Sequence, residues 1–550
     1  MKQKTSFYRL LTLIVVVTLF LVACGGKDGA VDEDAESAGP DVEAEADEES
    51  LIIGISNNID SVNPFQRTGT QSTYVQRFFY ETLLNMVGPT EFEPRLADIE
   101  TEDNQTFTVT INKEAEWTDG EPVTVDDLVY TINTTAHPDT VTTQSANIAM
   151  IEGTDEDGKL ADGETEVSGL EVVDDYTLDI TTKSPLDINY FSEFFGNNVM
   201  IAPEHVFSEY EPGDIHTSPA ATNPTVMNGA YTLVENKEND YAHLEANPNY
   251  YRGTPKIDHI YVRILSGTAM VTDLQAGDID MIAGGGISVL SPTDIPILEE
   301  SDHLDIDSYP SVGVQYLLPN IESERFADPK VRQALAYAVD RELAIENLLL
   351  GNGEVPATPY TSVSEYKSED IEPFPYDENK AQKLLEEANF DFDEPVTFIV
   401  PTGNAIREQM AELVQQNLEA IGMNIQMETY DFTTWINTAR ESDFDIGIIG
   451  MSHYYDPNVQ NYFSSGGGNN LGFYKDEKMD DLIREGNAGT SFEERQPIYE
   501  ELQEYFVDEM PTIPLYSEYD DKVQDSRLVG GVDEFWPASI ADVQEWHFEE

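Results

Sequence analysis

Cys24 is the only cysteine among the 550 residues, so the sequence limits what its thiol can do. No disulfide can form within the chain, so the thiol is left for chemical modification. Ala23 precedes it, Gly25 follows it, and a run of apolar residues ends at this point. A small residue at the end of such a run is typical of a segment that is cut from the mature protein.

The residues before Cys24 have the pattern of an export signal. Lys2, Lys4 and Arg9 give the start of the chain a positive charge, and residues 10–22 form an apolar run that is short for a membrane span. The pattern resembles the bacterial lipobox, in which the cysteine thiol takes a diacylglycerol and becomes the mature N-terminus. This resemblance implies a signal peptide over residues 1–23 and a lipoprotein on the extracytoplasmic face of the cell membrane. The alternative is an ordinary secretory signal with a chance cysteine.

The next segment, residues 24–50, predicts an acidic disordered tether. It combines Gly, Ala, Ser and Pro with eleven acids and has no aromatic residue. Such a segment buries too little apolar surface to offset the entropy of ordering it. No later apolar stretch reaches the roughly 18 residues of a membrane span. We therefore expect the lipid on Cys24 to be the membrane attachment.

The net charge of −77 comes from 106 acids against 29 Lys and Arg. It argues against a nucleic-acid partner, which needs a basic surface to replace phosphate counterions. Basic ligands, calcium or the surroundings could explain the acids, but their spread over tether, loops and helix faces favours the surroundings. At molar salt the Debye length falls to about 3 Å, which screens the self-repulsion of the chain. We expect a halophilic protein that faces brine.

Motifs for catalysis or metal binding are missing from the sequence. There is no P-loop, no H-E-x-x-H and no G-x-S-x-G. The runs at 284–286 and 466–468 are glycine triplets that read as turns, and the segment 155–158 departs from an EF-hand loop. With eight histidines and one cysteine, a structural zinc site is not expected. The sequence predicts no catalytic residue, no cofactor and no bound metal.

Hydrophobic periodicity predicts an α/β fold. Residues 51–55 and 107–111 have the composition of strands, and residues 125–132 that of a helix. In the carboxyl half, one helical face runs from Asp328 past Leu343 until Gly351 stops it. Strand 396–400, helix 410–421 and strand 425–429 follow as a βαβ unit, and 444–450 adds another buried strand.

Several of these segments, in this order, resemble the peptide-type (family 5) solute-binding proteins of ABC importers, which include oligopeptide-, dipeptide- and nickel-binding receptors. The resemblance covers residues 52–516 and rests on these segments: Asn63-Pro64, Tyr80-Glu-Thr-Leu-Leu84, Glu93-Pro-Arg-Leu-Ala97, 107–132 with Trp117-Thr-Asp-Gly120, Ala202-Pro-Glu-His-Val206, Asn228-Gly-Ala-Tyr231, Asn247-Pro-Asn-Tyr-Tyr-Arg-Gly253, Leu274-Gln-Ala-Gly-Asp-Ile-Asp280, 328–353 and Pro511-Thr-Ile-Pro-Leu515.

The resemblance implies a periplasmic-binding-protein-like fold of type II, with two lobes that close around a ligand by a hinge motion. By family position, the first lobe would combine residues 51–93, 220–306 and 520–550. An inserted subdomain would occupy residues 94–219, and the second lobe residues 307–519.

The resemblance also implies candidate ligand-binding residues in several parts of the chain. By family position these are Thr70, Gln71 and Tyr74, then Asn228 and Gly229, then Trp435, and finally Met451, Ser452, His453 and Tyr454 in the loop after the 444–450 strand. Arg407 is a further candidate, as a partner for a ligand carboxylate. Core packing is the alternative role for Trp435.

The loop at 450–458 departs from the family pattern. Peptide receptors commonly have a Trp directly after the glycine and, a few residues later, an Asp that pairs with the peptide ammonium. Here Met451 replaces the Trp, and His453 or Tyr454 stands near the Asp position. Asp456 reads as a loop cap. His453 could donate or accept a hydrogen bond, ligate a metal complex, or be a partly exposed loop residue.

We thus expect a monomeric receptor that binds a peptide or peptide-like solute without changing it. It would hand the solute to a membrane permease that is driven by ATPase subunits in other chains. A lipid-anchored peptide hydrolase is the alternative from another class. A receptor for signalling peptides is a further possibility, because its fold and cleft would be the same.

Overall fold

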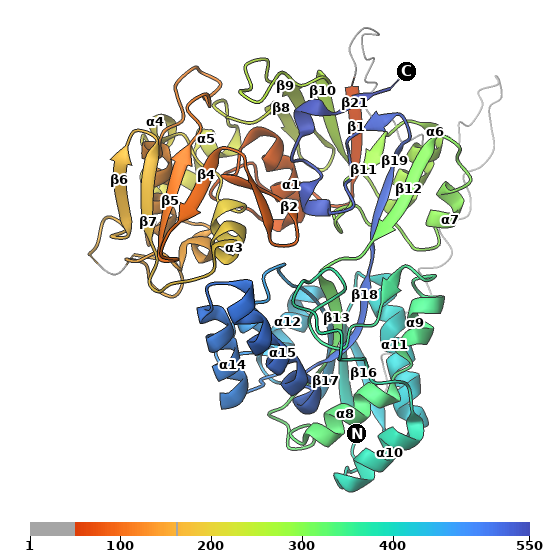
Figure 1. Cartoon of the computed structure of the whole chain (residues 1–550). Helices are drawn as coiled ribbons and strands as arrows, with labels where there is room; N and C mark the ends of the chain where they lie inside the picture. The colour runs from red at the N-terminus through yellow and green to blue at the C-terminus, as the bar shows by residue number, and fades with distance from the viewer. Residues whose placement is uncertain (1–49, 161–162, 550) are drawn as a thin grey trace, which may run out of the picture. The chain divides into compact units, whose positions relative to one another are not determined.

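Two large β-sheets form the framework of the protein (Figure 1), as seen in a computed structural model that describes residues 50–160 and 163–549. These residues belong to one unit, Glu48–Glu550. Cys24, the predicted signal peptide and almost all of the predicted tether lie outside the described residues. Ser50 does not belong to the tether as predicted, because it is the first residue of strand β1.

The first sheet has seven strands, in the order β12 (Leu304–Tyr309), β19 (Asp520–Asp525), β11 (Met281–Ile282), β1 (Ser50–Ile55), β10 (His259–Ile264), β9 (Tyr241–Ala246) and β8 (Tyr231–Lys237). β1 pairs in parallel with β10 and β11, and the other pairs are antiparallel. Its helices are α1 (Gly69–Phe79), α6 (Gly267–Ala276) and α7 (Ile295–Leu298). The lobe boundary expected at residue 306 falls inside β12.

The second sheet has six strands, in the order β14 (Gly353–Glu354), β18 (Ile513–Glu518), β13 (Gly313–Pro319), β17 (Ile446–Ser452), β15 (Val396–Pro401) and β16 (Ile425–Tyr430). Helices on its two faces are α8 (Pro329–Ala338), α9 (Arg341–Asn347), α10 (Glu378–Glu387), α11 (Ala405–Ala420), α12 (Phe432–Arg440), α13 (Gln460–Phe463), α14 (Glu477–Ala488) and α15 (Phe492–Glu509). β15 and β16 run parallel on either side of α11, which confirms the predicted βαβ unit.

A smaller sheet lies beside the first one. Its strands are β4 (Ala97–Thr101), β5 (Thr106–Ile111), β7 (Thr177–Thr181) and β6 (Leu170–Asp174). With it come α2 (Val125–Ala136), α3 (Ile188–Phe191), α4 (Glu204–Phe207), α5 (Pro219–Thr222) and a π-helical turn (Ser192–Gly196). Two short pairs complete the strands: β2 (Leu84–Gly88) with β3 (Glu91–Pro94), and β20 (Leu528–Val529) with β21 (His547–Phe548).

The helix predicted from Asp328 to Gly351 is in fact two helices. α8 ends at Ala338, and α9 starts at Arg341. Asp340 separates them, because its side chain accepts a hydrogen bond from the backbone of Leu343 and so caps the second helix. Leu343 is 39% exposed and does not continue the buried face of α8.

The hydrophobic cores divide the described residues into two lobes. The seven-stranded and four-stranded sheets share one core, which contains Leu51, Phe107 and Phe191. The six-stranded sheet has separate cores on its two faces, with Leu317 in one and Tyr316 in the other. No described core cluster joins the six-stranded sheet to the other two sheets. The first lobe, which includes the four-stranded sheet, therefore meets the second lobe without a shared apolar core.

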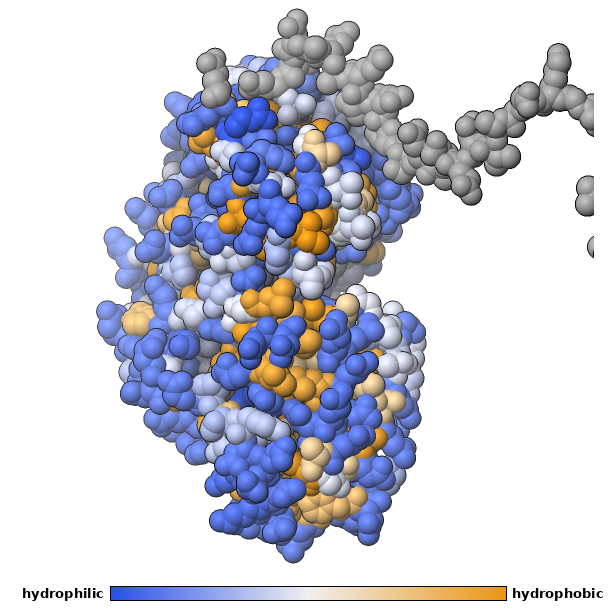
Figure 2. Space-filling view, turned by 90° about the vertical axis from the view of Figure 1, so that its right-hand side faces the viewer, coloured by the Kyte–Doolittle hydropathy of each residue, from blue (hydrophilic) through white to orange (hydrophobic). Residues whose placement is uncertain are grey.

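The surface turned to the viewer in Figure 2 is mainly hydrophilic, with apolar residues gathered near its middle height. This agrees with the acid-rich composition. Within the part of the chain that the structure describes, no helix is long and apolar enough to cross a membrane.

The polypeptide crosses between the lobes in two segments of the described chain. Residues 310–312 join β12 to β13, and Tyr519 joins β18 to β19. The crossings are neighbours, because β12 pairs with β19 in one lobe and β13 pairs with β18 in the other. Ser311 Oγ donates to the carbonyl of Glu518 at 2.8 Å. Two short connections side by side form a hinge, as Figure 1 shows at the middle of the molecule.

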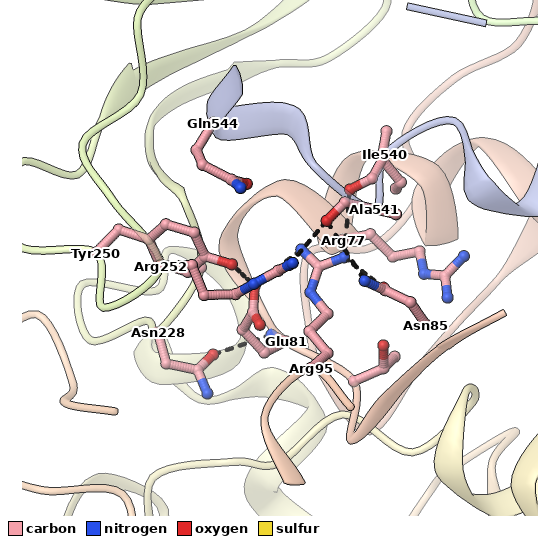
Figure 3. A network of polar contacts seen from close by, with 12 residues as sticks. Arg77, Glu81, Asn85, Arg95, Asn228, Tyr250, Arg252, Ile540, Ala541 and Gln544 are labelled. Atoms are coloured by element: carbon pink, nitrogen blue, oxygen red, sulfur yellow. Dashed lines mark hydrogen bonds and ion pairs between the residues drawn. The ribbon is translucent and has the colours of Figure 1, made fainter. Parts of the chain in front are cut away.

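A buried ion pair fastens the C-terminal segment to the first lobe (Figure 3). Arg95 Nη2 lies 2.8 Å from Glu81 Oε1, and both side chains are almost completely buried. Glu81 also accepts a hydrogen bond from the hydroxyl of Tyr250 (2.9 Å). On the other side, Arg95 Nη1 donates to Asn85 Oδ1 (2.9 Å) and to the carbonyl of Ile540 (3.2 Å).

We expect Arg95→Met to lower the stability of the protein by about 3–5 kcal/mol, because Glu81 would stay buried without its counter-charge. Arg527→Met is the matched control. Arg527 pairs with Asp525 at 2.8 Å, but its side chain is 62% exposed, so its loss should change the stability far less than the loss of Arg95. Urea unfolding followed by tryptophan fluorescence measures both. Equal unfolding midpoints for the two variants would contradict the prediction.

Candidate ligand-binding site

Two cavities lie between the lobes, on either side of Trp536. The first, which we call the hinge chamber, encloses about 460 Å³. The first lobe contributes the glycine run 284–286, and the second lobe contributes Gln315, Arg407, Met451 and Ser452. The crossing segment completes the wall with residues 518–521. The chamber thus touches both lobes and the hinge that joins them.

The second cavity, the arginine chamber, encloses about 450 Å³. Residues from the loop before α1 and from α1 itself form one wall: Arg67, Gly69, Thr70, Thr73, Tyr74 and Arg77. Glu193, Asn197 and Asn198 form another, and the second lobe adds the loop residues 453–455. Tyr455, Trp536 and Pro537 line both chambers, so the chambers adjoin.

Trp536 is fixed between the chambers. Its indole Nε1 donates to the carbonyl of Ala283 at 2.9 Å, and its ring stacks on Tyr74 with centroids 6.4 Å apart. Gly285 has φ +55°, and a Cβ at this position would come within 2.2 Å of the Trp536 ring. The glycine run 284–286 was predicted to be a flexible turn, but it packs closely against the ring of Trp536.

The hinge chamber is acidic. Burial, with a contribution from the charge of Asp521, raises the pKa of Glu518 to about 7. Burial also raises the pKa of Asp520 to about 7, again helped by its charged neighbours. Lys522 does not neutralise this group, because it pairs with Asp305 at 3.1 Å. The guanidinium of Arg407, across the chamber, donates through Nε to Gln315 Oε1 at 2.9 Å.

The arginine chamber holds a neutral histidine. His453 is 9% exposed, and burial lowers its pKa to about 3. Its Nε2 lies 2.6 Å from the hydroxyl of Tyr316, whose pKa burial raises well above the usual value. Of the three roles considered for this residue, the structure thus gives it that of a hydrogen-bonded, buried imidazole. The described residues contain no group of three or more His, Cys, Asp or Glu that could hold a metal ion.

Polar contacts join the lobes at the rim of the arginine chamber. The carboxylate of Glu193 accepts hydrogen bonds from the backbone N–H groups of Tyr455 (3.0 Å) and Asp456 (2.7 Å). Asp456 in turn forms a two-bond ion pair with Arg495, at 2.6 and 2.9 Å. Burial, followed by the charge of Asp456, raises the pKa of Glu193 to about 8. Asp456 caps its loop, as predicted, by accepting a hydrogen bond from the backbone of Asn458. It also takes part in the contact between the lobes, because its own backbone N–H donates to Glu193.

The structure brings seven of the predicted ligand residues to the two chambers. Arg407, Met451 and Ser452 line the hinge chamber, and Thr70, Tyr74, His453 and Tyr454 line the arginine chamber. The other four line neither of them: Gln71, Asn228, Gly229 and Trp435.

Trp435 is a correction to the predicted site. Its side chain is completely buried in the core that packs on the six-stranded sheet, beside Gly447. Asn228 is 1% exposed, and its Oδ1 accepts from the backbone of Glu81 at 3.0 Å. A Cβ on Gly229 would meet the carbonyl of Phe78 at 2.4 Å. These three residues are structural here, and Gln71, which is 9% exposed, accepts from Thr70.

The sequence reasoning missed Arg67, Arg77, Glu193, Asp520 and Trp536. The arginines could have been noticed, because Lys and Arg are scarce in this chain and two stand near the first helix. No comparable signal marks Glu193 or Trp536, whose roles depend on contacts with residues more than 250 positions away in the sequence.

Comparison with known proteins gives consistent results. The model for bacterial extracellular solute-binding proteins, family 5, matches residues 91–472. The oligopeptide-binding protein AppA of Bacillus subtilis is 25% identical over 538 residues, which cover 94% of each chain. The periplasmic oligopeptide-binding protein OppA of Salmonella typhimurium is 27% identical over 497 residues, which cover 86% of this chain and 87% of that protein.

Solved structures show the same fold. AppA from Bacillus subtilis in complex with a nonapeptide superposes with a TM-score of 0.75, at 24% identity, over 92% of this chain and 100% of that one. The ABC transporter substrate-binding protein CtaP of Listeria monocytogenes superposes with a TM-score of 0.80, at 25% identity and the same coverage. These structures confirm the predicted α/β fold with two lobes.

We expect Glu193→Ala to loosen the contact between the lobes, because two backbone N–H groups lose their acceptor. Each loss costs about 1–3 kcal/mol, so the amides of Tyr455 and Asp456 should exchange with solvent at least about tenfold faster. Hydrogen–deuterium exchange of the full chain, read on the peptide that contains residues 453–457, measures this. Glu171→Ala, at an exposed position on β6, is the control. Unchanged exchange in Glu193→Ala would contradict the contact.

Proposed function

The chain belongs to the bacterial extracellular solute-binding proteins, family 5, and we propose that its solute is a peptide or peptide-like molecule held between the two lobes. The receptor would deliver this solute to the permease of an ABC importer. Members of the family are solute-binding proteins and not enzymes, so the predicted receptor class is confirmed and the peptide-hydrolase alternative is set aside.

The observation that carries the proposal is the pair of adjoining chambers, which are lined by both lobes and by the hinge. Each has a volume within the range of small-molecule sites, roughly 300–1,000 Å³, at about 460 and 450 Å³. Solute held there would contact both lobes and would therefore favour their closed arrangement. The peptide-binding names of the relatives AppA and OppA support the choice of solute.

The charge of the hinge chamber supports a solute with an ammonium group. A buried ammonium needs a compensating negative charge. The 450–458 loop lacks the Asp that commonly provides it in this family, but Glu518 and Asp520 line the chamber. Neither side chain forms an ion pair with a Lys or Arg of the described residues. They are the carboxylates that we assign to a solute ammonium.

The proposal extends to the location of the receptor. The residues from Lys2 to Cys24 support export and a lipid anchor on Cys24, which would keep the protein at the extracytoplasmic face of the cell membrane. A single receptor chain encloses both chambers, so we propose a monomer. Whether the peptides are nutrients or signals does not alter this architecture.

We expect the full chain, purified in detergent from its host, to carry an intact peptide-like solute. Native mass spectrometry would detect the complex, and denaturation would release the solute for identification. Ser452→Trp should empty the site by filling the hinge chamber, whereas Ser208→Trp, at an exposed position outside both chambers, should not. A chain that emerges empty and binds no member of a peptide mixture would contradict the proposal.

We further propose that the receptor works in brine. Its charge of −77 generates self-repulsion, and the distance over which salt screens this repulsion falls from about 30 Å at roughly 0.01 M to about 3 Å at roughly 1 M. The surface acids are then compatible with a stable fold only where salt is abundant.

We expect the melting temperature of the chain to rise steadily with NaCl or KCl from dilute buffer to molar concentration. Differential scanning calorimetry measures the change, and sucrose at equal osmolality controls for effects that do not act on charge. A flat or falling melting temperature in salt would contradict the adaptation to brine.

A further inference from the structure

We propose that the arginine chamber binds a carboxylate of the solute through Arg67 and Arg77. This inference rests on the proposed function, and it adds that the receptor selects solutes with a negatively charged group. The group is either the C-terminal carboxylate of a peptide or an acidic side chain. The assignment follows from the hydrogen bonds, burial and charge of the residues that line this chamber.

Neither arginine has a carboxylate partner among the described residues. Arg67 donates through Nη1 to the carbonyl and to Oδ1 of Asn198, and through Nε to Thr73 Oγ1 at 3.3 Å. Arg77 donates through Nη2 to the carbonyl and to Oδ1 of Asn197. All of these acceptors are neutral. Arg407 in the hinge chamber also lacks a carboxylate partner, but of the two chambers the arginine chamber is the one that brings two such guanidinium groups together, which a negatively charged ligand would explain.

Arg77 is the more deeply buried of the two arginines. It is 8% exposed, and its Nε is buried without any hydrogen-bond partner in the described chain. Figure 3 shows its guanidinium pointing away from Glu81, whose carboxylate is already taken by Arg95 and Tyr250. Burial, followed by the charge of Arg67, lowers the pKa of Arg77 to about 9. A buried guanidinium in this position favours a negative group nearby.

Two more buried polar groups of the chamber lack partners. The hydroxyl of Tyr74, which is 2% exposed, makes no hydrogen bond, and neither does Nδ1 of His453. When the hydroxyl of Tyr316 donates to Nε2 of His453, Nδ1 carries the hydrogen of the neutral ring. Tyr74, His453 and Arg77 then all present hydrogen-bond donors, which is what a carboxylate accepts.

The start of α1 adds to the positive potential. Gly69 and Thr70 line the chamber, and the helix has no acid in its first turn and no side-chain cap at Thr68. Its first N–H groups carry the positive end of the helix dipole. The acid that lines the chamber, Glu193, uses its carboxylate for Tyr455 and Asp456, and burial raises its pKa to about 8. Both of its oxygens thus bind the second lobe, and among the described residues Glu193 forms no ion pair with Arg67 or Arg77.

A purely structural role for the arginines is the competing explanation. They fasten residues 197–198 to α1, and a neutral glutamine could make the same bonds to a carbonyl or an amide oxygen. A guanidinium offers in addition a planar pair of donors that matches a carboxylate. The remaining donors of Arg67 and Arg77 are available for this purpose, since Arg67 Nη2 and Arg77 Nη1 make no hydrogen bond within the described chain.

The test compares peptides that differ only in their carboxylates. A mixture of pentapeptides would be offered to the full chain after its solute is removed, and the retained sequence would be resynthesised in four forms. These have a free or amidated C-terminus combined with an acidic residue or its amide counterpart, and titration calorimetry gives their affinities. We expect the loss of one particular carboxylate to weaken binding by about tenfold or more. If amidation of the C-terminus has this effect, the chamber binds the C-terminal carboxylate; if the amide side chain has it, the chamber binds the acidic side chain.

Arg77→Gln should weaken the preferred peptide by about the same factor and leave its carboxylate-free form unchanged. Arg77→Lys, which keeps the charge, should restore part of the affinity. Arg407→Gln, in the hinge chamber, should not remove the discrimination between the two forms. As a control, urea unfolding of each variant would test whether the protein is still folded under the conditions of the titration.

The inference would be overturned if Arg77→Gln weakened both forms of the peptide equally, or neither. It would also be overturned if Arg407→Gln abolished the discrimination, because the carboxylate would then lie in the other chamber. A chain that retains no peptide at all contradicts the proposed function, and this inference with it. Retained peptides whose affinity does not depend on any carboxylate contradict the inference alone.

Discussion

The paired crossing of the chain between the two sheets is the constraint on which the rest of the structure depends. β12 continues into β13 and β19 follows β18, so two antiparallel ladders meet end to end at residues 310–312 and at Tyr519. Each crossing is too short to form an apolar core of its own. The hydrogen bond from Ser311 to the carbonyl of Glu518 keeps the crossings together. The lobes are thereby held in register along one edge while the opposite side stays free to open.

The lobes can move about this hinge because they do not share an apolar core. The described apolar clusters belong to one lobe or the other, so opening the cleft exposes little packed hydrophobic surface. The contacts that bridge the rim are few. Glu193 accepts hydrogen bonds from the backbone N–H groups of Tyr455 and Asp456, Arg495 lies 3.9 Å from Asp187, and the rings of Phe194 and Tyr454 have centroids 4.4 Å apart. Water can replace such hydrogen bonds when the lobes separate. Closure is therefore reversible, and a solute in the two chambers can shift its equilibrium.

The sequence predicted the fold well because periodicity and capping are local. Residues 396–429 gave the correct βαβ unit, and the motif order gave the family. The break between α8 and α9 was missed because the capping role of Asp340 competes with a continuous apolar pattern. In the site, family position correctly placed Met451 and His453 at the chambers. It also selected Trp435, whose side chain is completely buried in the core, because a position in the sequence does not show which face of a helix packs inward. Glu193 and Trp536 depend on contacts between distant segments, which periodicity does not encode.

The charge of the chain also bears on the chambers. Acids outnumber Lys and Arg by 106 to 29, so a buried arginine has many carboxylates available to it. Arg95 pairs with Glu81, and Arg495 pairs with Asp456 and lies 3.9 Å from Asp187. Arg67 and Arg77 have no such partner among the described residues, although they lie in a cavity where their charge is poorly solvated. Salt screens exposed charges far more than buried ones. In brine, the attraction of the acidic surface for cations is thus reduced, whereas a carboxylate that enters the chamber still meets two nearly unscreened guanidinium groups.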